Sequence, residues 1–461
     1  MLSLFTEEEI NLQKGGKENK GPRYACAHRD APIEESLSKF RDMRDGKFKP
    51  KEVFLRMKMN LLDSGNPNMW DMAAYRITDT SHHHKTTDKW RIYPTYDFTH
   101  CLCDAFETIT HSLCTTEFTT SRESYDWLLD ELKEFLPAIP QQREYGRLNI
   151  AGTVLSKRKI AKLVEEKYVR GWDDPRLYTL IAVRRRGIPP GAIRAFVAEL
   201  GVSDSNSVIQ YVRLEAVVRK YLERTVPRLM LIPDPIPVII EDLPEDYCEE
   251  ITLEFMRGEP TMGSHVVPFT RTVYIDRSDF RTEASEDFYR LAPGKTVGLL
   301  NVQYPIKATS FKSEASTGRV TEICAVYERP PAGEAFSKPK AYIQWVAKSA
   351  AHSSPVRAEV RIFNALFRSA RPEDCEGGFL NDINPNSEEV FPNAVIECGF
   401  HEIQKRAPWP KDHVPNLHSG PWDVRFQGMR VAYFALDTDS TEDKIILNKI
   451  VSLKEDAGKA G

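Results

Sequence analysis

Hydrophobic positions repeat with a helical period near the start of the chain. Leu37, Phe40 and Met43 lie three residues apart and predict a helix that ends near Gly46. Short runs of β-branched, aromatic and other apolar residues follow this helix and predict strands at 53–57, 73–77 and 90–93. We therefore expect residues 23–93 to form a small α+β unit.

Three further stretches differ in their hydrophobic pattern. Helical and strand-like segments alternate over residues 94–188, which is typical of one half of an α/β nucleotide-binding fold. Residues 189–232 have helical spacing throughout. Over residues 233–461 short apolar runs are separated by Pro, Gly and Asp, which predicts one or two β-barrels. Residues 1–22 show little periodicity, and we expect a disordered or truncated edge there.

Composition narrows the class of protein. A chain of 461 residues is long enough for about three domains. The formal net charge of −4 excludes a uniformly basic nucleic-acid coat, so a polyanion would have to be bound by local patches. Eight irregularly spaced cysteines fit reduced thiols in the cytosol, and no apolar run approaches the ~18 residues of a membrane span. We expect an intracellular protein without a membrane partner.

The most informative local feature is a cationic turn at Ser156–Lys159. Three cations lie in the first turn of a predicted helix, where the helix dipole disfavours each by roughly a few tenths of a kcal/mol. An anion bound at this helix start would explain them, with Ser156 and backbone amides donating hydrogen bonds and Lys157 neutralising charge. A solvated basic face is the alternative, and on this feature alone it is favoured.

A second group combines the side chains of Tyr96, His100, Cys101, Cys103, His111 and Cys114. Its soft ligands raise a zinc hypothesis. Cys101 and Cys103 are two residues apart, hence about 200° apart around a helix, and cannot converge on one ion. We therefore expect no metal and favour a small-molecule pocket where a strand passes to a helix.

A third basic tract, Arg184–Arg186, could contact phosphate. It precedes Gly187 at a predicted helix end, where cations suit the helix dipole, so a structural role is the favoured interpretation.

Several ordered motifs then identify a family resemblance. In sequence order they are 93–101 (YPTYDFTHC), 109–118 (ITHSLCTTEF), 144–149 (EYGRLN), 154–159 (VLSKRK) and 171–176 (GWDDPR). Together they closely resemble the glutaminyl-tRNA synthetases, a family of class I aminoacyl-tRNA synthetases, in their eukaryotic cytosolic form. The similarity runs from about Pro22 to Lys454.

The resemblance implies a multidomain α/β plus all-β fold. Its parts would be a partial Rossmann-type catalytic domain, an inserted α+β acceptor-end domain, a helical subdomain and two C-terminal β-barrels. The corresponding ranges are 1–22 (disordered or truncated edge), 23–93 (acceptor-end-binding insertion), 94–188 (second half of the catalytic domain), 189–232 (helical stem-contact subdomain) and 233–461 (anticodon-binding barrels).

The resemblance also implies site residues. Glutamine would contact Tyr96, His100 and Cys114. ATP, with Mg²⁺, would be bound by Thr115, Arg147, Leu148, Leu155, Ser156 and Lys157. Ser156 and Lys157 would be catalytic in a mobile KMSKS-type loop, with Lys157 stabilising charge on the departing pyrophosphate. Val154 stands where that motif has its first lysine, so Lys157 would carry the charge of the loop alone. We expect the cationic turn and the tyrosine–histidine–cysteine pocket to form two walls of one cavity.

The anticodon of tRNA(Gln) would be read by the last part of the chain. The matching positions are Arg228, Arg290, Gln427 and Arg430. Unstacked bases offer their edges to such side chains, while phosphate contacts set the register. By the same resemblance we expect a cytoplasmic monomer.

Two alternatives to a complete glutamine–tRNA ligase stay open. A glutamate–tRNA ligase is disfavoured because that branch usually has an arginine, a partner for a carboxylate substrate, where this chain has Cys114. A noncatalytic tRNA-binding fragment is the other, since the sequence contains no His-x-Gly-His segment of the class I ATP site. On that ground we expect the chain to lack the first half of the nucleotide fold. Half a parallel sheet would leave a hydrophobic strand edge open. We also expect negligible glutamine-dependent ATP–pyrophosphate exchange.

Overall fold

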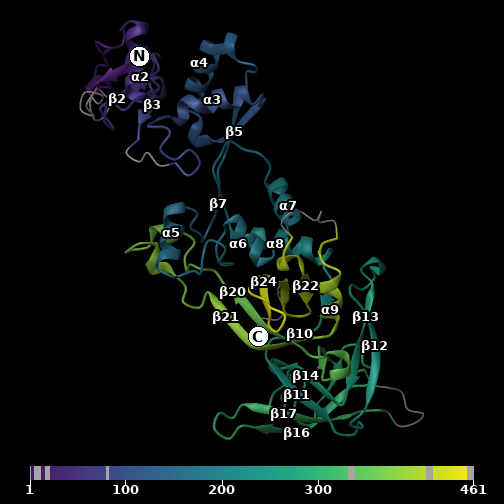
Figure 1. Cartoon of the computed structure of the whole chain (residues 1–461). Helices are drawn as coiled ribbons and strands as arrows, with labels where there is room; N and C mark the ends of the chain where they lie inside the picture. The colour runs from purple at the N-terminus through teal and green to yellow at the C-terminus, as the bar shows by residue number, and fades with distance from the viewer. Residues whose placement is uncertain are drawn as a thin grey trace. The chain divides into compact units, whose positions relative to one another are not determined.

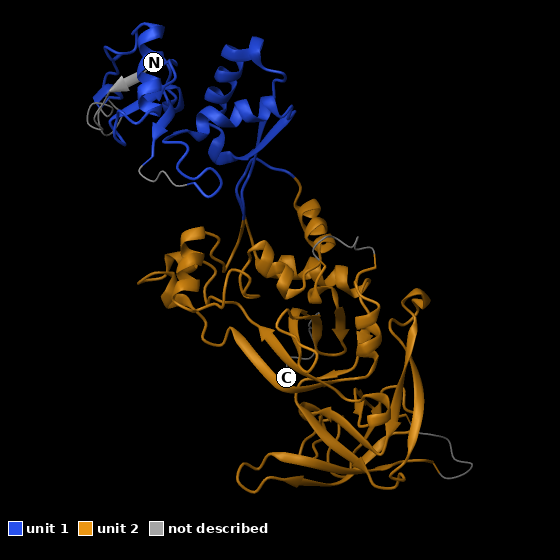
Figure 2. Ribbon diagram, in the orientation of Figure 1, with its two compact units in different colours: residues 1–148, 202–207 blue, residues 149–201, 208–461 orange. Residues whose placement is uncertain are grey.

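A computed structural model of the chain describes residues 2–4, 12–15, 21–78, 83–330, 338–411 and 419–453. The chain divides into two compact units (Figures 1 and 2). The first unit comprises residues 1–148 and 202–207, and the second comprises residues 149–201 and 208–461. Among the described residues, no helix combines the length and the apolar character that a membrane span requires.

The first unit contains a four-stranded antiparallel sheet in the order β1-β2-β3-β4. The strands are β1 (Leu2–Leu4), β2 (Val53–Arg56), β3 (Ala73–Ile77) and β4 (Ile92–Pro94). Helix α2 (Ile33–Arg44) adds Met43 to a small core with Val53 and Ile92. The helix and strands predicted for 23–93 are therefore present, and β1 brings part of the segment 1–22 into the sheet.

The rest of the first unit has a β-α-β arrangement. Its elements are α3 (Tyr96–Phe106), β5 (His111–Thr115), α4 (Arg122–Leu132) and β6 (Gln141–Tyr145). Strands β5 and β6 pair in parallel, which requires a crossover, and α4 supplies it. Cys101, Ala105, Tyr125 and Leu128 form the core between α3 and α4. This agrees with the alternating pattern seen in the sequence.

Among its described residues, the second unit has the α-helices α5 (Lys157–Glu165), α6 (Leu180–Arg186), α7 (Pro190–Leu200), α8 (Tyr211–Glu223) and α9 (Gly399–Lys405). A two-stranded sheet of β7 (Leu148–Ile150) and β8 (Ser207–Ile209) carries the chain from one unit to the other. The prediction of uninterrupted helix over 189–232 is wrong at β8, β9 (Arg228–Leu229) and β10 (Leu231–Ile232). Strands β9 and β10 form because they pair with distant strands, β9 with β22 (Arg228 with Gln427, 199 residues apart) and β10 with β21 (Leu231 with Ile396, 165 residues apart).

The second unit contains two seven-stranded sheets (Figure 1). We call one the middle sheet, with the order β18-β15-β16-β17-β11-β14-β19. Its strands are β11 (Pro235–Ile240), β14 (Thr272–Asp276), β15 (Thr296–Leu299), β16 (Ile306–Ser313), β17 (Val320–Tyr327), β18 (Tyr342–Ile343) and β19 (Val346–Ala347). The hairpin of β12 (Cys248–Glu254) and β13 (Ser264–Thr270) accompanies it. Trp345, Phe269 and Ile236 are fully buried in its core.

The other sheet, which we call the C-terminal sheet, has the order β10-β21-β20-β24-β23-β22-β9. Besides β9 and β10 it contains β20 (Val356–Phe363), β21 (Glu388–Ile396), β22 (Arg425–Gly428), β23 (Ala432–Leu436) and β24 (Ile445–Ser452). Two sheet-rich regions thus occupy the range in which the sequence predicts barrels.

The region around α5 packs against the C-terminal part of the chain. Val154, Ile160 and Leu163 share one core with Leu366 and Phe367. Because of this core, residues 149–188 belong to the second unit, so the unit boundary falls inside the range 94–188 that the sequence treats as one domain.

The arginine tract at the end of α6 has a structural role, as the sequence favours. Arg185 and Arg186 are buried. Arg185 pairs with Asp437, and Arg186 pairs with Glu215 at 3.0 Å. Gly187 ends the helix with φ 101°.

Candidate functional site

The three predicted glutamine contacts lie together in the first unit. Tyr96 is the first residue of α3, and His100 lies one turn later with its ring stacked on Tyr96 at 4.9 Å between centroids. Cys114 lies on β5 and is 8% exposed, whereas Tyr96 is 55% exposed. Burial and, after it, the neighbouring Cys114 raise the pKa of Tyr96. In this cluster the neutral Cys114 side chain is therefore buried, whereas the Tyr96 ring is exposed to solvent.

A polar network supports His100 from behind. The Oδ2 of Asp104 lies 3.3 Å from the Nε2 of His100, one helical turn along α3. Ser112 donates a hydrogen bond to Asp104, and the Ser112 and Tyr125 hydroxyls are 2.7 Å apart. Burial raises the pKa of Tyr125, so its hydroxyl remains protonated and donates to Asp104. These contacts hold the imidazole in one orientation, although the sequence singles out none of the three supporting residues.

Two cysteines of this region lie on different sides of α3. Cys101 is buried in the α3–α4 core and Cys103 is exposed, as expected for two residues on different sides of a helix. Burial raises the pKa of Cys101 to about 12, which disfavours the thiolate that a metal needs. Within the described ranges, no group of three or more His, Cys, Asp or Glu side chains is placed to bind a metal ion.

Three predicted ATP contacts lie at one edge of the β5–β6 pair. Thr115 ends β5, and Arg147 and Leu148 follow β6, so all three lie beyond the carboxyl ends of parallel strands, where such sheets bind nucleotides. The side chain of Thr115 and the charge of Arg147 both lower the pKa of Glu117, with the Thr115 hydrogen bond as the larger cause. Glu117 and Arg147 are 3.9 Å apart.

The other predicted ATP contacts, Leu155, Ser156 and Lys157, surround the start of α5 in the second unit. Ser156 is the N-cap residue, yet its side chain makes no capping hydrogen bond, and the first turn contains no acidic residue. Lys159 pairs with Glu373 at 2.7 Å, whereas Lys157 is exposed with no ion pair to any described residue. Within the described part of the chain, the Ser156 hydroxyl and the Lys157 ammonium group are thus both available to an anion. That it shares one cavity with the Tyr96 cluster stays a prediction.

The four predicted anticodon contacts lie in the second unit as two pairs. Arg228 on β9 lies opposite Gln427 on β22 in the parallel register. Arg430 follows β22 and forms two hydrogen bonds of 3.0 Å with Asp279. Arg290 approaches the same carboxylate at 3.1 Å. The register thereby joins residues 199 positions apart, and the shared carboxylate joins arginines 140 positions apart.

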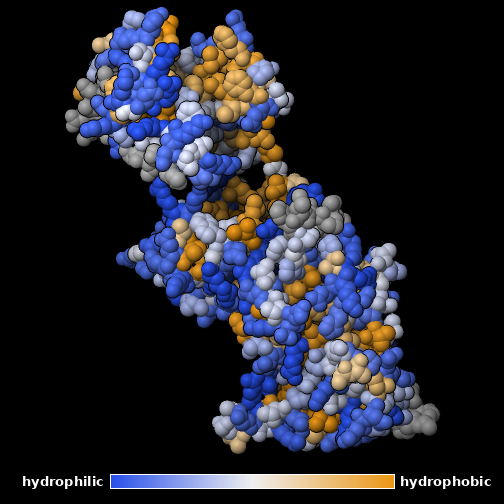
Figure 3. All heavy atoms as spheres, in the orientation of Figure 1, coloured by the Kyte–Doolittle hydropathy of each residue, from blue (hydrophilic) through white to orange (hydrophobic). Residues whose placement is uncertain are grey.

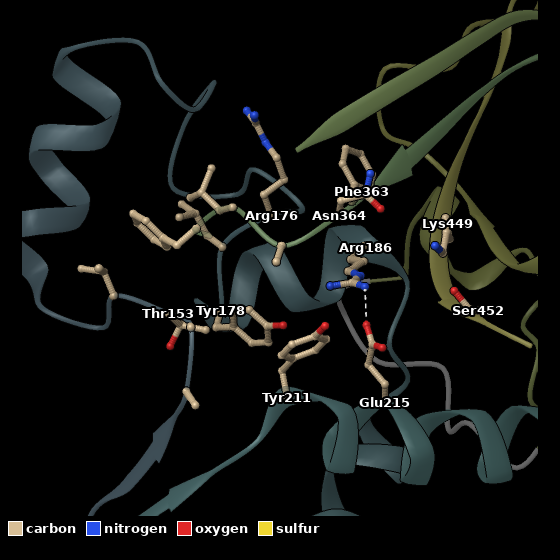
Figure 4. Close-up of a pocket in the computed structure, with 17 residues that line it drawn as sticks. Thr153, Arg176, Tyr178, Arg186, Tyr211, Glu215, Phe363, Asn364, Lys449 and Ser452 are labelled. Atoms are coloured by element: carbon tan, nitrogen blue, oxygen red, sulfur yellow. Dashed lines mark hydrogen bonds and ion pairs between the residues drawn. The ribbon is translucent and has the colours of Figure 1, made fainter. Parts of the chain in front are cut away.

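A cavity of about 150 Å³ lies elsewhere in the second unit (Figure 4). Its lining includes Tyr178, Tyr211 and Lys449, and the Arg186–Glu215 pair, drawn as a dashed line. Burial and the nearby Arg186 lower the pKa of Lys449. None of the predicted site residues lines this cavity, which forms where α6, α8 and β24 meet.

Comparison with known proteins supports the same assignment. A family model described as "tRNA synthetases class I (E and Q), catalytic domain" matches residues 3–224. Two models described as the anti-codon binding domain of these enzymes match residues 226–328 and 342–408.

Curated relatives match nearly the whole chain. Glutamine–tRNA ligase protein virJ of Hypocrea virens is 55% identical, over 98% of this chain and 68% of the relative. The probable glutamine–tRNA ligase of Schizosaccharomyces pombe is 52% identical, over 98% of this chain and 55% of the relative. The glutamine–tRNA ligase of Saccharomyces cerevisiae is 51% identical, over 98% of this chain and 57% of the relative. The chain thus spans between about half and two thirds of the length of these relatives. On these matches, and on the motifs and clustered residues above, the chain belongs to the glutaminyl-tRNA synthetase family of class I aminoacyl-tRNA synthetases.

Proposed function

We propose that this chain supplies the glutamine pocket, the triphosphate-binding loop and the anticodon-reading region of a glutamine–tRNA ligase. In that reaction the glutamine carboxylate attacks the α-phosphate of ATP and pyrophosphate leaves, which gives glutaminyl adenylate. A hydroxyl of the terminal ribose of tRNA(Gln) then attacks the acyl carbon, forms the ester and releases AMP. The observation that carries the proposal is the cluster of Tyr96, His100 and Cys114 on α3 and β5.

The charges of this cluster favour an amide over a carboxylate. Cys114 is buried, and burial followed by the negative charge of Asp104 raises the pKa of its thiol, so the side chain stays neutral. The Asp104 carboxylate stands 3.3 Å behind His100 and disfavours a second carboxylate in the pocket. Glutamine is therefore a better substrate than glutamate for this pocket.

The start of α5 supports the role of Lys157. Negative charge develops on the leaving pyrophosphate, and an exposed ammonium at a helix N-terminus stabilises it without first breaking an ion pair. The unengaged Ser156 hydroxyl supplies a hydrogen-bond donor beside it. Thr115, Arg147, Leu148 and Leu155 would complete the contacts with ATP.

A thermal-unfolding titration tests the substrate preference on the purified chain. Glutamine is expected to raise the unfolding midpoint more than glutamate does at equal concentration, because only a ligand that binds the folded state stabilises it. The Cys114→Arg variant places a cation in the pocket and should reverse this order. Equal shifts by both amino acids, in both proteins, would contradict the proposed pocket.

A noncatalytic tRNA-binding module is the second candidate. The observation in its favour is that Arg228, Arg290, Gln427 and Arg430 all lie within the second unit, so RNA binding does not depend on the amino-acid pocket. Filter binding with tRNA(Gln) and an anticodon-substituted transcript distinguishes the candidates. Anticodon-dependent binding with no response to glutamine would support the module, whereas both responses together would support the ligase. We further propose that the protein acts as a monomer in the cytoplasm.

A further inference from the structure

Asp279 connects two of the arginines that we propose for anticodon reading, and this inference rests on that proposed function. Asp279 ends the short 3₁₀ helix at Arg277–Asp279, and its side chain is 2% exposed. Its two carboxylate oxygens accept hydrogen bonds of 3.0 Å from Nη1 and Nη2 of Arg430. One of these oxygens also lies 3.1 Å from Nη1 of Arg290.

The backbone fixes Asp279 relative to Arg290. The amide of Leu291 donates to the carbonyl oxygen of Asp279 at 3.1 Å, and the amide of Arg281 donates to the carbonyl oxygen of Leu291 at 3.1 Å. Phe280 and Leu291 form an isolated β-bridge. Arg290 is therefore anchored beside the carboxylate through its own main-chain neighbours.

Arg430 reaches the same carboxylate from a different element. It follows β22 of the C-terminal sheet and has φ 61°, whereas Asp279 follows β14 of the middle sheet. The fork of Arg430 makes a bidentate contact, the geometry that orients a guanidinium most strongly. One buried carboxylate thus sets the orientation of two cations that come from two sheets.

Each arginine keeps donors for a ligand. The side chains of Arg290 and Arg430 are 40% and 35% exposed, although the carboxylate between them is buried. Two guanidinium groups against one carboxylate leave one net positive charge. Side chains already held in place lose less conformational entropy when they bind, so their remaining N–H groups are preorganised. Arg228 lies on β9, beside β22, and its Nε is buried without a hydrogen-bond partner among the described residues.

We propose that Asp279 is a positioning residue for anticodon recognition, which holds the guanidinium groups of Arg290 and Arg430 so that their free donors meet base edges in one geometry. It contacts no base itself. Its loss therefore reduces discrimination between anticodons more than it reduces overall affinity for RNA.

The test compares Asp279→Asn with the unchanged full chain. The amide retains the shape of the side chain, but its NH₂ group opposes guanidinium donors and its charge is gone. Filter binding measures the ratio of Kd for an anticodon-substituted tRNA(Gln) to Kd for the unsubstituted tRNA. We expect this ratio to fall by about tenfold. A ratio that stays within twofold, even with weaker binding of both tRNAs, overturns the proposal and leaves Asp279 a purely structural clamp between the sheets.

The chain offers a matched control. Asp234 also connects two arginines of the middle-sheet region, Arg277 at 2.9 Å and Arg319 at 2.9 Å. Asp234→Asn should leave the Kd ratio within twofold. A fall in the ratio equal to that of Asp279→Asn would show that the effect is general loss of charge, and would also overturn the proposal.

Two further variants separate this inference from the proposed function. Arg430→Lys keeps the charge but loses the fork, and we expect a fall in the ratio similar to that of Asp279→Asn. Arg290→Ala with Arg430→Ala removes the readers themselves. An unchanged ratio in this double variant contradicts anticodon reading, whereas a fall here with an unchanged ratio in Asp279→Asn contradicts only the role of Asp279. Should Asp279→Asn not fold, Asp279→Glu decides the question with the same readout, because it keeps the charge and both readers but displaces the carboxylate that holds them.

Discussion

Asp437 is fully buried and lies among groups that balance its charge. Nε and Nη2 of Arg185 donate to its two oxygens at 3.0 and 2.9 Å, and the amide of Asn448 donates as well. Arg185 also pairs with the more exposed Asp439. Burial alone would raise the pKa of Asp437, but the hydrogen bonds and charge of Arg185 outweigh it, so the pKa is lowered.

Asp437→Asn should lower the free energy of unfolding by about 3–5 kcal/mol, because the substitution leaves the buried Arg185 guanidinium without its main counter-charge. Urea unfolding at neutral pH measures the change. Asp439→Asn is the control, with an expected loss below about 1 kcal/mol, since Asp439 is 45% exposed and screened by water. Equal losses in the two variants would contradict this account.

The same pair predicts a pH dependence. A carboxyl group whose pKa is lowered by folding stabilises the protein above its unfolded pKa of about 3.9, and this contribution is lost as the pH falls below that value. The difference in unfolding free energy between the unchanged chain and Asp437→Asn should therefore be full at pH 7 and shrink below about pH 4. Urea titrations at several pH values measure this difference in unfolding free energy. A difference that does not change with pH would contradict the lowered pKa of Asp437.

Helix α6 illustrates how a helix end depends on its neighbours. Gly187 has φ 101°, and a Cβ atom there would lie 2.3 Å from the Cβ of Ala435 on β23. The end of the helix is thus held both by its backbone conformation and by the C-terminal sheet.

Gly187→Ala should cost about 2–4 kcal/mol, from left-handed backbone strain together with overpacking. Gly318→Ala is the matched control, because Gly318 has φ 68° but no atom within 4 Å of the added Cβ. Its expected cost is about 1 kcal/mol. Chemical denaturation measures both, and similar costs would show that the contact with Ala435 relaxes freely.

Apolar side chains are exposed on β5 and just after α4. Leu113 on β5 is 69% exposed, and Phe135, just after α4, is 77% exposed. Figure 3 shows hydrophobic side chains gathered over α3 and α4. Parallel strands are usually covered on both faces by other elements. An apolar surface that stays exposed can bind other apolar groups.

Leu113→Thr with Phe135→Gln should reduce the fluorescence of the apolar dye ANS bound to the chain. Threonine suits a strand, and both positions are exposed, so the free energy of unfolding should change by no more than about 0.5 kcal/mol. Undiminished fluorescence in a folded variant would locate the apolar surface elsewhere.

The two units have separate cores. Cys101, Tyr125 and Leu128 belong to a core of the first unit, while Trp345 and Ile236 belong to a core of the second. Units with their own cores can unfold separately. Each also contains its own group of proposed ligand contacts.

Calorimetry should therefore resolve two unfolding transitions, and Gly187→Ala, which lies in the second unit, should lower only one of them. A single transition that shifts as a whole would show that the units unfold as one.

Local patterns in the sequence predict much of the fold. The helical period of Leu37, Phe40 and Met43 corresponds to α2, and the apolar runs of the second half correspond to strands of the two sheets. They could not predict β9 and β10, because these two-residue strands exist only through pairing with β22 and β21. The sequence could have predicted the supporting role of Asp104, since this residue lies four positions after His100 on one face of α3.

The amino-acid sequence by itself determines the family, the kinds of side chain at the proposed glutamine pocket and the cationic start of α5, because motifs and helical periods are local properties of the chain. Tertiary packing alone decides that Arg185 pairs with Asp437, and that Asp279 meets Arg430, 151 residues away. Such contacts depend on how whole sheets pack, and the order of residues around Asp279 does not reveal which distant arginine will approach it.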